Sequence, residues 1–177
     1  NKYFRRYLGV IFASLFFMFG AFSGTALADA SFTVSESDGS TTVTESGSTD
    51  TFTVVLGEQP SSDVVFSVST GDSGEATVSP STLTFTSGNW DSAQTITVAG
   101  VDDNLIDGSQ TTTITLSVVD EISDDDFDSL ADQTVSVTTT DDDTAGFTVT
   151  QSDGSTSVDE SESTDDFTVV LDAQPTS

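Results

Sequence analysis

The chain has 177 residues with 30 acidic and only 3 basic side chains, and it contains neither His nor Cys. A surface with so little positive charge repels phosphate backbones and anionic lipids, which excludes nucleic-acid binding. Without His and Cys, the chain has no Ser-His or Cys-His nucleophile, none of the usual zinc, copper or haem ligands, and no disulfide. We therefore expect a protein that is not an enzyme.

The first 28 residues have the pattern of a secretory signal. All three basic residues lie within the first six positions, and an apolar run from Leu8 to Phe22 follows them. Small residues then provide a cleavage site after Ala28, with Ala30 as a second candidate. This pattern predicts a secreted or cell-surface protein; the alternative is an uncleaved membrane anchor. After cleavage no Lys, Arg or His remains, so only solvent cations or bound metal can neutralise the carboxylates, and we expect no membrane insertion.

The rest of the chain contains an internal repeat. Residues 31–62 and 146–177 are identical at 22 of 32 aligned positions, at an offset of 115. A period of this length indicates whole domains in tandem rather than a solenoid. We expect a signal peptide at 1–28, one complete unit at 29–145 and the start of a second at 146–177, all within a longer precursor.

The complete unit has the pattern of an all-β domain. Thr and Val dominate, apolar residues alternate with polar ones, and turn signals rich in Gly, Pro, Asn and Asp separate the runs. This predicts an immunoglobulin-like antiparallel β-sandwich of about seven strands, in tandem repeats. The alternating residues expected to point inward are Phe52, Val54, Leu56, Val64, Phe66, Val68, Leu83, Phe85, Ile96, Val98, Ile114, Leu116, Val118, Val135 and Val137.

Three aspartate clusters lie between these runs: Asp102 and Asp103 with Asp107, Asp124–Asp126 with Asp128, and Asp141–Asp143. The first and third each follow a predicted strand, at 96–98 and 135–137. Strand ends of the same polarity share one tip of a sandwich, so we expect these two clusters to meet. The second cluster lies in a long loop, and we expect its carboxylates to be solvated.

Clustered carboxylates become favourable when a divalent cation lies between them. Calcium binds about 6–8 oxygens in flexible geometry, whereas magnesium keeps its waters and a stricter octahedron. The sequence therefore favours calcium at the tip where the first and third clusters meet.

Two segments, GVDDNLIDGSQTTTITL at 100–116 and VSVTTTDDD at 135–143, resemble the Calx-β domain family. This family comprises the calcium-binding sandwiches of sodium–calcium exchangers, and it also occurs in bacterial surface proteins. Gln110 stands where the family has a second glutamate, which implies weaker binding. The resemblance implies these ligands: Glu45, Asp72, Asp102, Asp103, Leu105 through its main-chain carbonyl, Asp107, Asp141, Asp142 and Asp143.

We expect a calcium-binding structural repeat of a bacterial surface or adhesin-type protein, in which calcium orders the loop tip and stiffens the junction between repeats. Its partners would be calcium, neighbouring repeats of the same chain, and an extracellular protein or glycan. One alternative is a non-catalytic, glycan-binding module of a secreted enzyme, although Trp90 is the only Trp and no Tyr follows residue 28. Another is an acidic, salt-adapted spacer that binds no specific ion.

Overall fold

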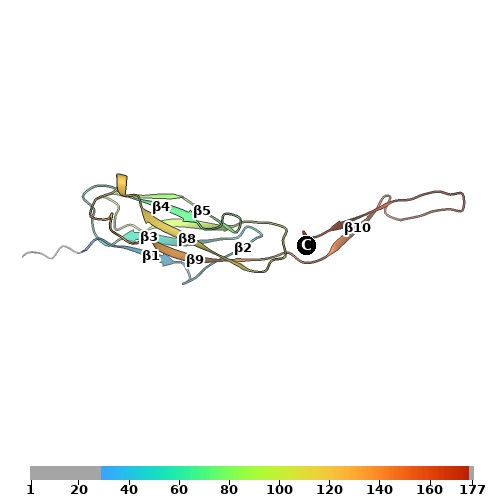
Figure 1. The fold of residues 1–177 in the computed structure, drawn as a ribbon, viewed down its shortest axis with the longest axis horizontal. Coiled ribbons are helices and arrows are strands. Elements are labelled where there is room, and N and C mark those ends of the chain that lie inside the picture. Colours follow the sequence, from blue (N-terminus) through green and yellow to red (C-terminus); the bar gives the residue numbers. More distant parts are fainter. Residues whose placement is uncertain (1–28, 176–177) are drawn as a thin grey trace, which may run out of the picture.

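The computed structural model describes residues 29–175. Nine strands form a two-layer β-sandwich, and two further strands form a hairpin that extends from one tip (Figure 1). The sandwich strands are β1 (Phe32–Glu36), β2 (Thr41–Thr44), β3 (Thr49–Leu56), β4 (Val64–Thr70), β5 (Ala76–Ser79), β6 (Thr82–Phe85), β7 (Gln94–Gly100), β8 (Gln110–Val118) and β9 (Gln133–Thr140). A 3₁₀ turn, η1 (Asp120–Ile122), follows β8.

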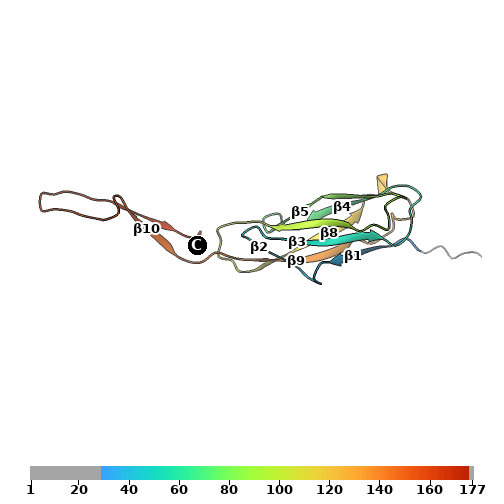
Figure 2. The ribbon, with the colours of Figure 1, turned by 180° about the vertical axis from the view of Figure 1, so that it is seen from behind.

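The two layers share the nine strands unequally. One sheet has the order β1-β3-β7-β5 and the other β2-β9-β8-β4-β6. Figure 2 shows the same two layers from behind. The alternation expected from the sequence is confirmed, because every residue expected to point inward is buried except Val118, which packs partly buried against the core. The fold is therefore the all-β sandwich that the sequence predicts.

Aromatic rings fill the space between the sheets. The ring of Phe32 in β1 meets that of Phe66 in β4 edge-on at a centroid distance of 4.8 Å, and Phe66 meets Phe85 at 5.9 Å. Such edge-on contacts are the preferred geometry for aromatic pairs. Trp90 packs partly buried against this core, so it is not a free stacking platform.

Two features differ from the predicted pattern. There are nine strands rather than about seven, because β2 and β5 have four residues each and place Thr41 and Ala76, rather than large apolar residues, at inward positions. In addition, β2 pairs with β9 in parallel, with Thr41 opposite Val137, whereas the other sandwich pairs are antiparallel. The chain reaches this arrangement because it crosses between the sheets after β1 and turns at Gly39, whose φ is +78°.

The hairpin consists of β10 (Phe147–Gln151) and β11 (Phe167–Leu171). Phe147 lies opposite Leu171, which is the register of Phe32 opposite Leu56 in the β1–β3 pair. Phe147 is 65% exposed, although its counterpart Phe32 is 7% exposed. The hairpin thus repeats the β1–β3 pairing without the strands that bury its apolar face.

Candidate metal centre

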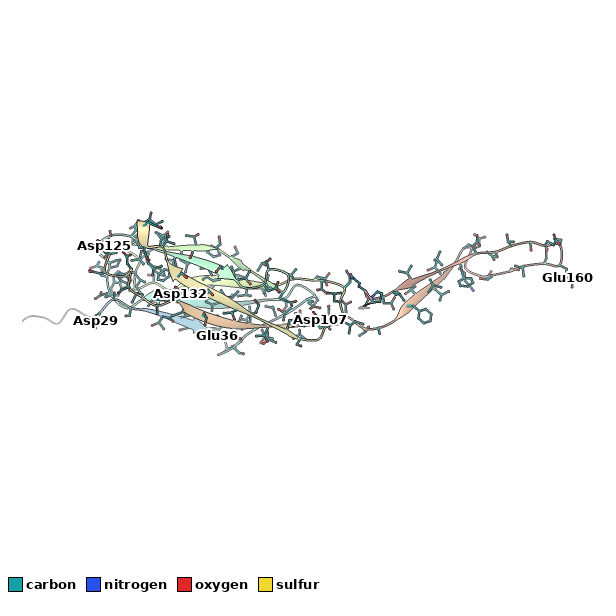
Figure 3. The ribbon with its side chains drawn as sticks, in the orientation of Figure 1. Asp29, Glu36, Asp107, Asp125, Asp132 and Glu160 are labelled. Carbon is teal, nitrogen blue, oxygen red and sulfur yellow. The ribbon has the colours of Figure 1, made fainter. Side chains whose placement is uncertain are left out.

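Several strand ends bring acidic side chains to one tip of the sandwich. Strands β2, β7 and β9 end there, and β5 begins there because Ala76 pairs with Gly100. The residues just beyond these strand ends are Glu45, Asp102 and Asp141, and Glu75 comes just before β5. Figure 3 shows this tip at Asp107, beside the hairpin. The predicted meeting of the first and third aspartate clusters therefore occurs.

One group of carboxylates at this tip, the inner group, consists of Glu45, Asp141 and Asp143. Each contributes an oxygen, and these oxygens lie within 4.8 Å of one another. Glu45 is 1% exposed. Its backbone N–H donates to the carbonyl of Thr140 at 3.1 Å, which extends the parallel β2–β9 pairing and fixes the glutamate beside the aspartate triplet.

The second group, the outer group, consists of Glu75, Asp103 and Asp107, again with oxygens within 4.8 Å of one another. The main chain holds Glu75 in place, because its carbonyl accepts from the Val101 N–H at 3.0 Å and from the Thr139 hydroxyl at 3.2 Å. The loop between the groups is linked to the inner group by the Gly108 N–H, which donates to Asp141 Oδ2 at 2.7 Å.

Three buried carboxylate oxygens at this tip have no hydrogen-bond partner: Oε2 of Glu45, Oε2 of Glu75 and Oδ2 of Asp143. An ionised carboxylate can only accept hydrogen bonds, and its neighbours here are also acceptors. Leaving an oxygen such as Glu45 Oε2 buried and unpaired costs about 1–3 kcal/mol or more. The tip therefore has acceptor atoms that a bound cation would satisfy.

The pKa values reflect the same crowding. Burial raises the pKa of Glu45, and the carboxylates of Asp141 and Asp103 raise it further. Burial also raises the pKa of Glu75, with a further contribution from Asp107. For Asp143 the main cause of a raised pKa is again burial, followed by repulsion from Asp141. Without a counter-charge, the raised pKa values of Glu45, Glu75 and Asp143 favour protonation of these three carboxyls.

The predicted ligands separate into two sets. Five of them lie in the two groups: Glu45, Asp103, Asp107, Asp141 and Asp143. The other four, Asp72, Asp102, Leu105 and Asp142, lie outside both groups. They remain predicted ligands, but they belong to neither group.

The surroundings of the three aspartates among these residues differ. Asp72 Oδ1 accepts from the Gly74 N–H at 2.8 Å, yet its charge contributes to raising the pKa of Glu75. Asp102 likewise contributes to the raised pKa of Asp143. The backbone N–H of Asp142 lowers the pKa of Glu45, and its side chain is exposed. All three carboxylates thus add negative charge around the tip without joining the groups.

Sequence reasoning missed Glu75. It lies in GDSGEATV, immediately before β5, so the signal available was a single glutamate before a short strand whose one buried residue is Ala76. The resemblance instead implies Asp72, three residues earlier, as a ligand. The pairing of β5 with β7 brings Glu75, rather than Asp72, next to Asp103 and Asp107.

Gly100 allows the strands that carry the site to approach closely. A Cβ at this position would overlap the carbonyl oxygen and carbon of Thr44, the residue before Glu45. We predict that Gly100→Ala destabilises the protein by about 1–3 kcal/mol through overpacking and also weakens any calcium response. Urea unfolding with and without calcium measures both effects.

Gly88→Ala is the matched control, because the nearest atom to a Cβ there, Thr86 Oγ1, lies 3.7 Å away, an ordinary contact. Equal stability of the two variants would show that the approach of Gly100 to Thr44 does not constrain this tip.

The remaining aspartate cluster lies at the opposite tip, near Asp125 and Asp132 (Figure 3). The expectation that its carboxylates are solvated is wrong for Asp124, which is 4% exposed. Asp124 Oδ2 accepts from the Ser61 N–H at 2.6 Å, the Ser61 hydroxyl at 2.8 Å and the Ser62 N–H at 2.8 Å. These bonds lower its pKa to about 2. These three hydrogen bonds, here called the Asp124 clamp, hold the loop together with the side chain of Phe127, which is 1% exposed.

Comparisons with known proteins locate the chain among β-sandwiches only. No family model and no curated protein sequence matches it. Among solved structures, the calcium binding domain CBD12 of CALX1.1 is 22% identical over 67% of this chain and 50% of that chain, with a TM-score of 0.46. The apo-form Calx CBD1 domain is 17% identical over 63% of this chain and 98% of that one, with a TM-score of 0.42.

The SafA pilin in complex with the SafB chaperone from Salmonella enterica has a comparable TM-score of 0.47 at 9% identity, over 66% of this chain and 57% of that chain. The chain thus spans about half of CBD12 and little more of the SafA–SafB match. Likenesses this distant carry no argument about ligands.

Within residues 29–175, no helix is long and apolar enough to cross a membrane. The predicted signal peptide at 1–28 lies outside the described residues.

Proposed function

We propose that this chain is a calcium-binding structural module of an exported protein, in which the ion orders one tip of the sandwich. The observation that supports this most strongly is Glu45, a carboxylate that is 1% exposed, has an unpaired oxygen and faces two more carboxylates. No Lys, Arg or His lies anywhere in residues 29–175 to neutralise it. A divalent cation would supply the missing charge.

The donor set favours calcium over other common metals. It consists of carboxylate oxygens, which suit hard cations, and it contains no nitrogen or sulfur ligand. Oxygens bound to one calcium at about 2.4 Å lie at most about 4.8 Å apart, so the oxygens of each group lie close enough to share one ion. Glu45, Asp141 and Asp143 would hold an ion in the inner group, and Glu75, Asp103 and Asp107 in the outer group.

The proposed role is mechanical. Between Asp143 and the hairpin there are only three residues, 144–146, so the candidate centre lies at the junction with the second unit. Without an ion, the six carboxylates repel one another over a Debye length, roughly 8 Å at physiological salt, and the tip loops separate. With calcium the loops hold one arrangement and the junction stiffens. We place the module on the cell surface or in a secreted protein because of the predicted signal peptide.

Thermal unfolding of residues 29–177 tests the proposal. We expect calcium to raise the midpoint well above its value in chelator, whereas magnesium at matched ionic strength raises it little. One site at a hundred times its dissociation constant adds about 2.7 kcal/mol, which corresponds to roughly 10 °C for a domain of this size. Asp143→Asn should reduce the rise more than Asp142→Asn, because only Asp143 belongs to the inner group.

Equal effects of calcium and magnesium would contradict the proposal. The carboxylates would then form an acidic, salt-adapted surface, and the module would be a spacer without a specific ion.

A further inference from the structure

The second unit contacts the first through the loop that carries the outer group. The backbone N–H of Gln174 donates to the carbonyl of Asn104 at 2.7 Å, and Gln174 forms a parallel β-bridge with Leu105. This is a main-chain contact between the end of the hairpin and the tip of the sandwich. It requires a defined course of the Asp103–Leu105 backbone, and it depends little on the side chains involved.

Gln174 corresponds to Gln59 at the repeat offset of 115. In the first unit, Gln59 follows β3, whose end lies at the tip opposite the candidate metal centre because Thr49, at its start, pairs with Ala99 at the end of β7. Gln59 Nε2 donates to the Ser87 carbonyl at 2.7 Å, which holds its loop in place. The Gln-Pro loop thus lies at the far end of the first unit, and in the second unit it lies at the end that contacts the first.

The loop that receives Gln174 is also part of the candidate centre. The Leu105 N–H donates to Asp103 Oδ1 at 2.6 Å, and the Gly108 N–H donates to Asp141 Oδ2 at 2.7 Å. Asp103 belongs to the outer group and Asp141 to the inner group. The backbone that binds the second unit is therefore held by two of the carboxylates that would hold ions.

We propose that the Asp103–Leu105 segment is a docking edge for the Gln-Pro loop of the following unit, and that ion binding at the adjacent carboxylates fixes this edge. The ion thereby controls the orientation of one unit relative to the next through main-chain hydrogen bonds. The control of this edge by an ion rests on the proposed calcium function, whereas the docking of the Gln-Pro loop does not.

The chain contains no Cys, so a pair of spin labels can report the orientation of the two parts. Ser69→Cys in β4 and Thr150→Cys in β10 replace exposed residues whose side chains make no hydrogen bond among the described residues. We expect a narrow distribution of label distances in residues 29–177 with calcium and a broader one in chelator. Gln174→Pro removes the donor and should abolish the narrowing while the calcium-dependent rise in unfolding midpoint remains.

Thr156→Pro, in the hairpin loop, is the matched control, because the Thr156 N–H makes no hydrogen bond in the described part of the chain. It should behave like the unmodified chain. Amide hydrogen exchange gives a second readout that needs no substitution at the contact: the Gln174 N–H should be protected in calcium. Unprotected exchange there, or a distance distribution unchanged by Gln174→Pro, would overturn the docking edge.

The two proposals can fail separately. If calcium produces no specific rise in midpoint, the proposed function and the ion control fail together. Docking is then judged by the effect of Gln174→Pro and by the protection of Gln174, both measured without an ion. If calcium raises the midpoint but leaves the label distances unchanged, calcium binding stands and ion control of the junction is wrong.

Discussion

Replacing Glu45 by Gln is expected to stabilise the metal-free protein and to remove most of its response to calcium. The substitution keeps the size of the side chain and removes a charge that is 1% exposed and faces Asp141 and Asp143. Relief of a buried, unsatisfied carboxylate should contribute about 1–3 kcal/mol in chelator. Loss of a charged ligand should weaken calcium binding at least tenfold, or about 1.4 kcal/mol. Thermal unfolding in chelator and across a calcium titration measures both effects.

Glu160→Gln is the matched control, because Glu160 occupies the equivalent position of the second unit and is exposed in the hairpin loop. It should change neither the metal-free midpoint nor the calcium response. Loss of an ordinary structural contact would lower the unfolding midpoint in chelator. If Glu45→Gln has this effect, then Glu45 is not an unpaired buried charge that a bound ion would neutralise.

The pH dependence in chelator follows from the same carboxylate. The pKa of Glu45 is raised in the folded protein, so the folded state binds a proton more tightly than the unfolded state. Its contribution to stability is complete below the ordinary value of 4.5 and is lost as the pH rises through the folded pKa. The metal-free midpoint should therefore rise as the pH falls from 7 toward 5, and less so in Glu45→Gln.

Replacing Asp124 by Asn should destabilise the sandwich at neutral pH with no effect on calcium binding. Asp124 accepts three hydrogen bonds on Oδ2 and a fourth, from the Asp126 N–H at 3.1 Å, on Oδ1. An amide cannot satisfy all of these donors, because its NH₂ group would face either the three donors at Oδ2 or the one at Oδ1. We expect a loss on the order of 2–3 kcal/mol, measured by urea unfolding at pH 7.

The sign of the pH effect at Asp124 is opposite to that at Glu45. Its pKa falls from 3.8 to about 2 on folding, so its contribution is present above 3.8 and is lost as the pH falls through about 2. The stability difference between the unmodified protein and Asp124→Asn should thus shrink between pH 4 and pH 2. The control is Asp125→Asn, an exposed neighbour. An equal loss in both variants would mean that the clamp does not hold this loop.

Much of the fold could be read from local sequence. Alternating apolar residues such as Phe52, Val54 and Leu56 predicted a buried face, and the structure buries it. Alternation is a local property, because successive side chains of a strand point to opposite faces. The same logic could not identify β2 or β5, since Thr41 and Ala76, rather than large apolar residues, occupy inward positions there. It also could not decide that β2 would pair in parallel with β9.

The candidate centre shows the same division. The order of strands and aspartates predicted that Asp103 and Asp107 would lie at the same tip as Asp141 and Asp143, because strand ends of one polarity meet there. The sequence alone determined that residues 29–175 contain no Lys, Arg or His to neutralise them. These conclusions needed only the chain order and the types of side chain.

Only the tertiary structure decided which carboxylates lie in each group. The β2–β9 pairing buries Glu45, the β5–β7 pairing brings in Glu75, and Asp142 is left exposed between two grouped neighbours. The tertiary structure likewise buries Asp124 through its hydrogen bonds to Ser61, although the sequence around Asp124 does not distinguish it from its exposed neighbours. The reason is physical: burial and hydrogen bonding depend on residues far apart in the chain, whereas the identity and spacing of charges are written in the sequence itself.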